Sequence, residues 1–211
     1  AQPDLNRTFR WAADVIKSTC PDAKVGVESE KISHSKWDFL QTQFPGDHLV
    51  DCSETLIESR MIKTPWEISV LRRAAEISEV AMNKTAHEIV PGMTEADVMK
   101  LFKMNCQIQS SDVQDILQAH TVAGNFAPAI VPRHDRLKVG DIVRLDGGPI
   151  YCGYGADLAR TFALGNKTDK HREEIYEILW KGNHCAMDML GPGVRMCDVF
   201  NAVQATIKQY I

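Results

Sequence analysis

The sequence has none of the features that mark a membrane protein or a nucleic-acid-binding protein. No apolar run approaches the ~20 residues that a membrane-spanning helix needs, although 44% of the 211 residues are hydrophobic. Neither charge dominates, because 24 lysines and arginines are interspersed with 28 aspartates and glutamates, for a net charge of −4. We therefore expect a globular protein with no basic nucleic-acid surface and no membrane segment.

The cysteines form no compact framework. The chain has six of them without a CxxC pair, and its first residues, Ala1 to Asp4, do not open a signal peptide. This pattern predicts reduced thiols in a cytoplasmic protein. Cys152 lies in a predicted turn, but no histidine stands near it in sequence, so we interpret it as a small filler rather than a nucleophile.

The stretch Asp141 to Phe162, DIVRLDGGPIYCGYGADLARTF, alternates apolar and polar residues on either side of a Gly- and Pro-rich centre. Such a pattern predicts a β-hairpin. Asp146 and Asp157 lie in its two arms, and a two-residue turn at Tyr151-Cys152 would make them cross-strand partners on one face. Like charges placed in this way repel each other.

Two readings of this aspartate pair remain open. The carboxylates can grip a cation between them, in which case the hairpin is one side of a metal site. Alternatively they are solvated residues near the hairpin ends, because Gly147, Gly148 and Gly153 can introduce a bulge that changes the register.

The run from Gly140 to Gly165 resembles the first metal-binding hairpin of the pita-bread metallopeptidase family, which includes methionine aminopeptidase, aminopeptidase P, prolidase and the metal-free relative creatinase. Besides the two aspartates, the features that match the family are Gly140-Asp141, the Gly after Asp146, Gly153-Tyr154, Arg160-Thr161 and Gly165. Arg60 to Lys63, ahead of this hairpin, is similar to the family's entry to its catalytic domain.

This resemblance implies a metal-dependent hydrolase that cleaves next to proline, with Asp146 and Asp157 as ligands of two divalent ions, Mn²⁺ first and Co²⁺, Zn²⁺ or Fe²⁺ as alternatives. Arg160 and Thr161 would support the ligands, although Arg160 could equally form a structural salt bridge. The other ligands, a His and two Glu, are expected beyond Ile211. The resemblance therefore implies a fragment that is inactive alone, from a cytoplasmic and homodimeric parent acting on a dipeptide or other small molecule.

The fold class expected is α+β, in two parts. Residues 1–59 would be the end of a creatinase-like α/β N-terminal domain with its linker, and residues 60–211 would be the first part, half or more, of a pita-bread catalytic domain. We expect helices over residues 4–19, 32–44, 64–89, 95–107, 169–190 and 197–210, and strands over 24–27 and 48–51, with 53–63 as a connection.

An internal echo supports this fold. Residues 91–98 and 192–199 share Pro, Gly, Asp and Val at a constant offset of 192 − 91 = 101. Each copy follows a predicted long helix and opens a shorter one, which favours two structural repeats.

One position departs from the family pattern. Peptidase members carry a His shortly before the first metal strand, after a Pro, and the matching position here is Ala129, which follows Pro128. His120 and His134 flank it out of register, and we interpret both as surface or loop residues. Two alternatives therefore stay open: a non-peptidase of the same fold that acts on a small amide, amidine or sulfonium compound, and an inactive pita-bread domain that binds another protein.

Overall fold

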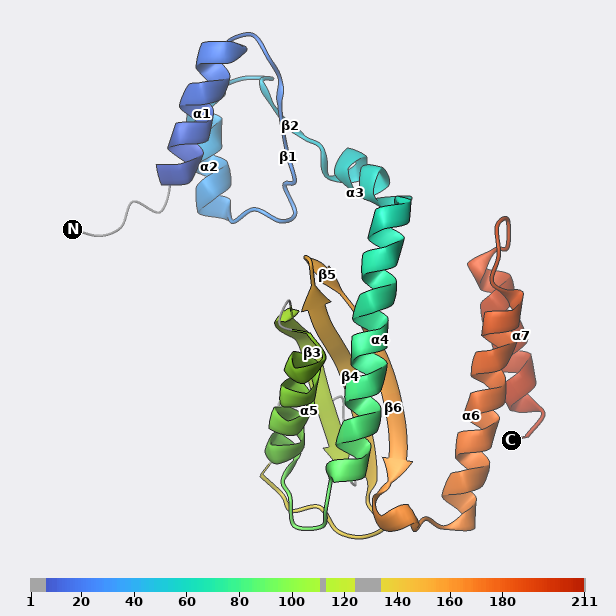
Figure 1. Cartoon of the computed structure of the whole chain (residues 1–211). Coiled ribbons are helices and arrows are strands. Elements are labelled where there is room, and N and C mark those ends of the chain that lie inside the picture. The colour runs from blue at the N-terminus through green and yellow to red at the C-terminus, as the bar shows by residue number, and fades with distance from the viewer. Residues whose placement is uncertain (1–6, 111–112, 124–133, 211) are drawn as a thin grey trace. The chain divides into compact units, whose positions relative to one another are not determined.

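A computed structural model describes residues 7–110, 113–123 and 134–210. The chain forms two compact units, Ala1–Glu67 and Ile68–Ile211 (Figure 1). The boundary between these units lies inside the first turn of a long helix, and the helix that follows residue 52 belongs to the first unit.

The first unit alternates helices and strands, as its sequence predicts. Its elements are α1 (Arg7–Thr19), β1 (Val25–Val27), α2 (His34–Gln43), β2 (Leu49–Asp51) and α3 (Ser53–Met61). β1 and β2 pair in parallel, and Ala13, Leu40 and Phe44 form the centre of a small core. The expected connection over 53–63 is thus wrong, since Asp51 accepts hydrogen bonds from the Ser53 backbone N–H and hydroxyl and starts α3 there.

The second unit consists of helices and a four-stranded antiparallel sheet. Its elements are α4 (Pro65–Glu88, whose first turn precedes the boundary), α5 (Glu95–Gln109), β3 (Val113–Ala123), β4 (Ile142–Tyr151), β5 (Tyr154–Gly155), β6 (Leu158–Ala163), a short 3₁₀ turn η1 (Leu164–Asn166), α6 (Lys170–Met189) and α7 (Met196–Lys208). β4 is the central strand and pairs with β3 on one side and with β5 and β6 on the other.

Side-chain caps begin α4, α5 and α6. Thr64 and Glu67 form a capping box at the start of α4, and Thr94 and Asp97 form an equivalent box at α5. At α6, the Asp169 carboxylate accepts a hydrogen bond from the Arg172 backbone N–H. These bonds satisfy N–H groups that a helix leaves without an internal partner, so the predicted starting points are confirmed.

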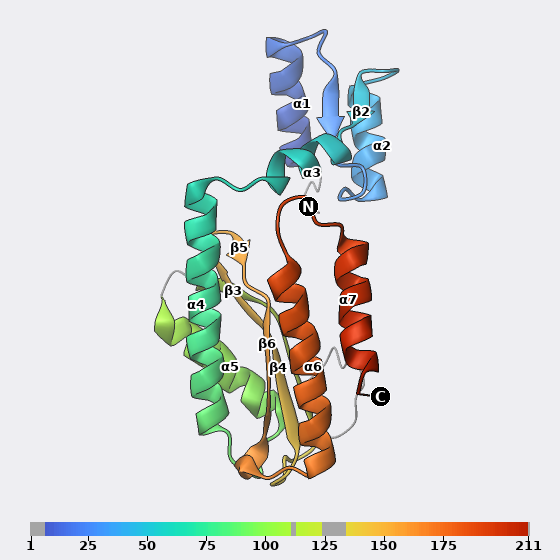
Figure 2. The ribbon, with the colours of Figure 1, turned by 90° about the vertical axis from the view of Figure 1, so that its right-hand side faces the viewer.

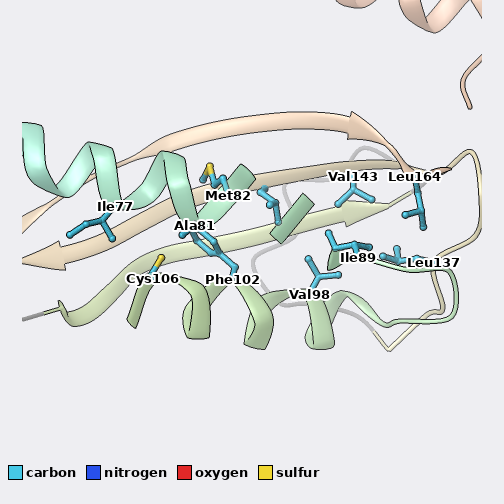
Figure 3. Packing of buried hydrophobic residues seen from close by; sticks show 11 residues of the cluster. Ile77, Ala81, Met82, Ile89, Val98, Phe102, Cys106, Leu137, Val143 and Leu164 are labelled. Atoms are coloured by element: carbon cyan, nitrogen blue, oxygen red, sulfur yellow. The ribbon is translucent and has the colours of Figure 1, made fainter. Parts of the chain in front are cut away.

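Helices α4 and α5 cover one face of the sheet (Figure 2). Ile77 and Met82 of α4 and Phe102 of α5 meet Val143 of β4 in one buried cluster (Figure 3). Alternation along β4 explains the arrangement, because Val143 and Leu145 point to the helices while the residues between them point to the other face.

Some apolar residues of α4 and α5 are exposed. Ile68 of α4 is 47% exposed and Met104 of α5 is 51% exposed, whereas Met99 of α5 is buried. The buried face of α4 instead begins at Val70 and continues through Ala74. The helical period of apolar residues predicts the helix well. A small rotation of the helix about its axis is nevertheless enough to change which of those residues are buried.

Helices α6 and α7 lie side by side as a helical hairpin (Figures 1 and 2). The two helices pack closely at Gly182, where an added Cβ would lie 3.2 Å from the Ile207 side chain. The connection before α7 matches the one before α5, since Gly92 and Gly193 both have positive φ, 96° and 86°, after a long helix and before a shorter one. This agrees with the repeat seen in the sequence.

No helix among the described residues is long and apolar enough to cross a membrane.

Candidate metal site

The hairpin that carries the two aspartates is closed at its base by backbone hydrogen bonds. Gly140 donates to the Leu164 carbonyl, and Leu164 donates to the Asp141 carbonyl, each at 2.9 Å. The Asp141 carboxylate accepts from the Lys138 N–H at 2.7 Å, and Gly140 has φ of 91°. The Gly-Asp pair before the first strand is therefore a structural device that turns the chain into β4.

The tip of the hairpin lies one residue later than the sequence suggested. Cys152 and Gly153 occupy the turn with φ values of 48° and 81°, as in the tight turns that match the twist of β-hairpins. Tyr151 pairs with Tyr154, and Asp146 consequently pairs with Ala159 rather than with Asp157. The expected cross-strand pairing of the two aspartates is thus wrong by two residues.

Asp157 lies in the short break between β5 and β6 and is exposed. It precedes Ala159 by two residues, so the period of a strand would return its side chain to the face that Ala159 shares with Asp146. On this register the aspartates would be diagonal rather than direct partners on adjoining segments.

An arginine already compensates the charge of Asp146. The Arg144 guanidinium lies 2.9 Å from Asp146 Oδ2, and these side chains are 31% and 29% exposed. Both residues project from the face of β4 opposite the core because they alternate with Val143 and Leu145. Repulsion between the aspartates therefore does not by itself require a bound cation.

The two residues expected to support the ligands lie on opposite faces of β6. Arg160 pairs in register with Leu145, and its guanidinium lies 3.6 Å from Glu79 of α4. Arg160 thus forms a salt bridge with a residue of α4. Thr161 is in register with Arg144, on the face that carries Asp146.

The donor set fits a hard divalent cation only in part. Carboxylate oxygens suit Mn²⁺ and similar ions, and Asp146 and Asp157 could supply two such ligands. Within residues 7–110, 113–123 and 134–210, no group of three or more His, Cys, Asp or Glu side chains is placed to hold a metal ion. Within this part of the chain, the two aspartates alone therefore do not complete a metal site.

The structure describes His120 but not position 129. His120 is the backbone partner of Asp146 across β3 and β4, so it is a strand residue and not a loop residue. Ala129, the position of the missing family histidine, lies outside the described residues.

Two cysteines of this unit, Cys152 and Cys106, differ in their exposure. Cys152 is exposed at the turn, and burial raises the pKa of the Cys106 thiol to about 12. A thiol with so high a pKa stays protonated and unreactive at neutral pH.

A groove of about 1330 Å³ borders the open face of the sheet. Arg144 and Thr161 line it from the sheet, and Tyr176 and Trp180 line it from α6. Neither Asp146 nor Asp157 is among its lining residues, so this groove and the pair of carboxylates do not coincide.

Comparison with known proteins places this hairpin in a recognisable context. Residues 69–211 match the sequence model of metallopeptidase family M24. The chain is 30% identical to Xaa-Pro dipeptidase of Pyrococcus furiosus over 97% of its own length and 58% of that protein. It is 29% identical to Xaa-Pro dipeptidase of Lactobacillus delbrueckii subsp. lactis, over 89% of this chain and 52% of the relative.

The fold has close structural counterparts as well. The structure of Xaa-Pro dipeptidase from Bacillus anthracis superposes with a TM-score of 0.84 at 23% identity, covering 94% of this chain and 56% of that one. The chain thus spans about half the length of the curated relatives and solved structures that it matches.

Proposed function

The chain belongs to metallopeptidase family M24 and has the pita-bread fold of its structural relatives, and from this premise we propose that the whole protein is a metal-dependent Xaa-Pro peptidase. The observation that carries the proposal is the placement of Asp146 and Asp157 on adjoining segments of one hairpin inside the matched region. The relatives named Xaa-Pro dipeptidase favour a substrate with proline after the scissile bond.

Divalent ions at such a site supply a Lewis acid for the scissile carbonyl and lower the pKa of a water so that it can attack at neutral pH. Asp146 and Asp157 would hold these ions through their carboxylates. Because Arg144 engages Asp146 through Oδ2, Oδ1 can act as the ligand while the arginine fixes the plane of the carboxylate. β4 and the turn at Cys152-Gly153 set the spacing of the two aspartates.

We propose two ions, with Mn²⁺ first and Co²⁺, Zn²⁺ or Fe²⁺ as alternatives, because carboxylates are hard ligands. A homodimer acting on a dipeptide or a comparable small molecule completes the proposal. With two carboxylates as its described donors, the 211-residue chain should bind metal weakly and be inactive alone.

The test is an assay of the whole protein with Mn²⁺ against Xaa-Pro dipeptides. Asp157→Ala should lower kcat/KM by more than about 100-fold, because removing a metal ligand removes several kcal/mol of transition-state stabilisation. Asp188→Ala is the matched control, since Asp188 is an exposed aspartate of α6, and it should keep full activity. An Asp157→Ala protein that hydrolyses the dipeptide normally would rule out the metal assignment.

Ala129 supports one alternative substrate class, because the family's peptidases carry a histidine at that position. If the whole protein binds Mn²⁺ but leaves every Xaa-Pro dipeptide intact, a small amide, amidine or sulfonium compound becomes the substrate to test. If it binds no metal, the inactive binding domain becomes the better reading.

A further inference from the structure

Ser78 is a polar residue fully buried in the face of α4 that packs on the sheet. Its hydroxyl donates a hydrogen bond to the carbonyl oxygen of Gly147 at 3.1 Å, between residues 69 positions apart in sequence. The positions next to it on this face, Ile77 and Ala81, are apolar core residues. A hydroxyl at this position is therefore not needed to fill the core, and it forms a specific tie between α4 and β4.

The tie falls at the least regular part of β4. Gly147 directly follows Asp146 and has φ of 134°, a conformation that residues with a side chain rarely adopt. Opposite it, the register of β3 shifts between Leu117 and Ala119, which is the mark of a β-bulge. Two successive glycines and an irregular ladder would leave the peptide after Asp146 poorly restrained without another contact.

The Ser78 hydroxyl also lies close to the point where the segment that carries Asp157 approaches β4. A Cβ built on Gly148 would be 2.4 Å from the Ala156 carbonyl oxygen and 3.0 Å from Ser78 Oγ. Ala156 directly precedes Asp157, and its N–H donates to the Pro149 carbonyl at 3.0 Å. Ser78, Gly148 and Ala156 thus meet at one point, between the two segments that carry the aspartates.

We propose that Ser78 is a positioning residue for the metal site, an inference that rests on the proposed function. By holding the Gly147 carbonyl beneath the Ala156 segment, it fixes how Asp146 and Asp157 face each other without touching the metal. Metal affinity depends on such supporting groups, because ligands that are already oriented lose less freedom on binding. Loss of the Ser78 hydroxyl would let β4 move at Gly147 and Gly148, and the segment that carries Asp157 would move relative to it.

The experiment is a Mn²⁺ titration of the 211-residue chain, followed by paramagnetic broadening of backbone amide signals in β4 and β6. This readout measures Kd even for weak binding and does not depend on activity. Ser78→Ala should weaken Mn²⁺ binding about tenfold, at the low end for residues that support metal ligands, because Ser78 acts through the backbone. Ser78→Cys, which keeps a weak donor of similar size, should give an intermediate Kd.

Thr85→Val is the matched control. Thr85 is also fully buried on α4, but its hydroxyl donates to the Ala81 carbonyl of its own helix at 2.7 Å and accepts from Asn105 at 3.0 Å. This variant loses a buried hydroxyl without loosening β4, so its Kd for Mn²⁺ should equal that of the wild type. Amide shifts of core residues such as Phe102 show whether each variant is folded.

The outcomes separate the inference from the function it rests on. If Ser78→Ala binds Mn²⁺ as tightly as the wild type, or no more weakly than Thr85→Val, the positioning role is wrong while the metal site stands. If the wild type shows no broadening around Asp146 and Asp157, the chain does not bind Mn²⁺ at this hairpin and the positioning role is wrong, whereas the function of the whole protein is decided separately by the dipeptide assay.

Discussion

Glycines decide where the two aspartates stand. An added Cβ at Gly148 would meet the backbone of Ala156, and Gly147 has a φ that favours glycine. The sequence predicted the hairpin and its two carboxylates from alternation and glycine placement. It could not predict the register, because the turn requires the non-glycine residue Cys152 to adopt a left-handed conformation, which is uncommon and has no sequence signal.

The ion pair between Arg144 and Asp146 was also not predicted from the sequence. Arg144 and Asp146 are two apart on one strand, and this spacing places them on the same face. The spacing was readable, but pairing within a strand competes with solvent and with cross-strand partners. Sequence alone does not say which of these wins.

The clearest effect of a single residue on pH dependence is expected at Asp51 in the first unit. The Ser53 hydroxyl, donating at 2.6 Å, is the main cause that lowers the pKa of Asp51 to about 2, with further bonds from the Ser29 and Ser53 N–H groups. In the unfolded chain an aspartate titrates near about 3.9. The ionised form is therefore favoured in the folded unit, and its stabilising effect is complete above about pH 4 and is lost as pH falls through about 2.

This prediction can be checked by following carboxyl carbon signals during an acid titration. Asp51 should titrate near pH 2, and Asp51→Asn should flatten the dependence of the first unit's stability on pH between about 4 and 2. Asp22→Asn, at an exposed aspartate in a turn of the same unit, is the control and should leave that dependence in place. A midpoint for Asp51 close to that of an unfolded aspartate would contradict the account.

At the scale of elements, helix starts were predictable and β3 was not. The capping residues Thr64 and Thr94 carry their signal locally, since a hydroxyl and an acidic residue three positions later satisfy each other's N–H groups. β3 has no such local signal. Its register shifts twice, between Val113 and Asp115 and between Leu117 and Ala119, so its apolar residues do not alternate with a period of two.

The cap of α5 makes a quantitative prediction at this scale. Thr94 Oγ1 accepts from the Asp97 N–H at 3.2 Å, and the Thr94 N–H donates to the Asp97 carboxylate at 3.0 Å, a bond that is the main reason the pKa of Asp97 is lowered. Thr94→Ala should reduce the free energy of unfolding of the second unit by about 1 kcal/mol. Thr94→Ser, which keeps the oxygen, should cost much less in a urea denaturation series.

The Thr94 measurement has an internal check. Removing the cap also removes the Thr94 side-chain bond to Asp97, at 2.7 Å, so the Asp97 pKa should move up toward its ordinary value in Thr94→Ala. A stability loss without that upward shift would place the effect elsewhere in α5.

At the scale of the whole molecule, the two units have separate cores of unequal size. The described core of the first unit is built from Ala13, Leu40 and Phe44, while that of the second draws on eleven buried residues between Ile77 and Leu164. The sequence predicted two parts because Arg60 to Lys63 resemble the entry to the family's catalytic domain. The exposed apolar residues of α6, including Leu179 and Trp180, show why burial is harder to predict than helix formation, since periodicity reports which residues share a face and not whether that face is covered.

These separate cores predict independent folding. A two-stranded sheet on a small core is marginally stable, and a unit of 67 residues buries only about 60% of the surface of its unfolded chain. We therefore expect thermal unfolding of the chain in two steps, the first belonging to residues 1–67. A chain of residues 64–211, which keeps the Thr64 cap of α4, should retain only the later step and the amide shifts of β4 and β6. If those shifts instead collapse toward random-coil values, the second unit depends on the first. The core in Figure 3 is then not sufficient to hold the hairpin that carries Asp146 and Asp157.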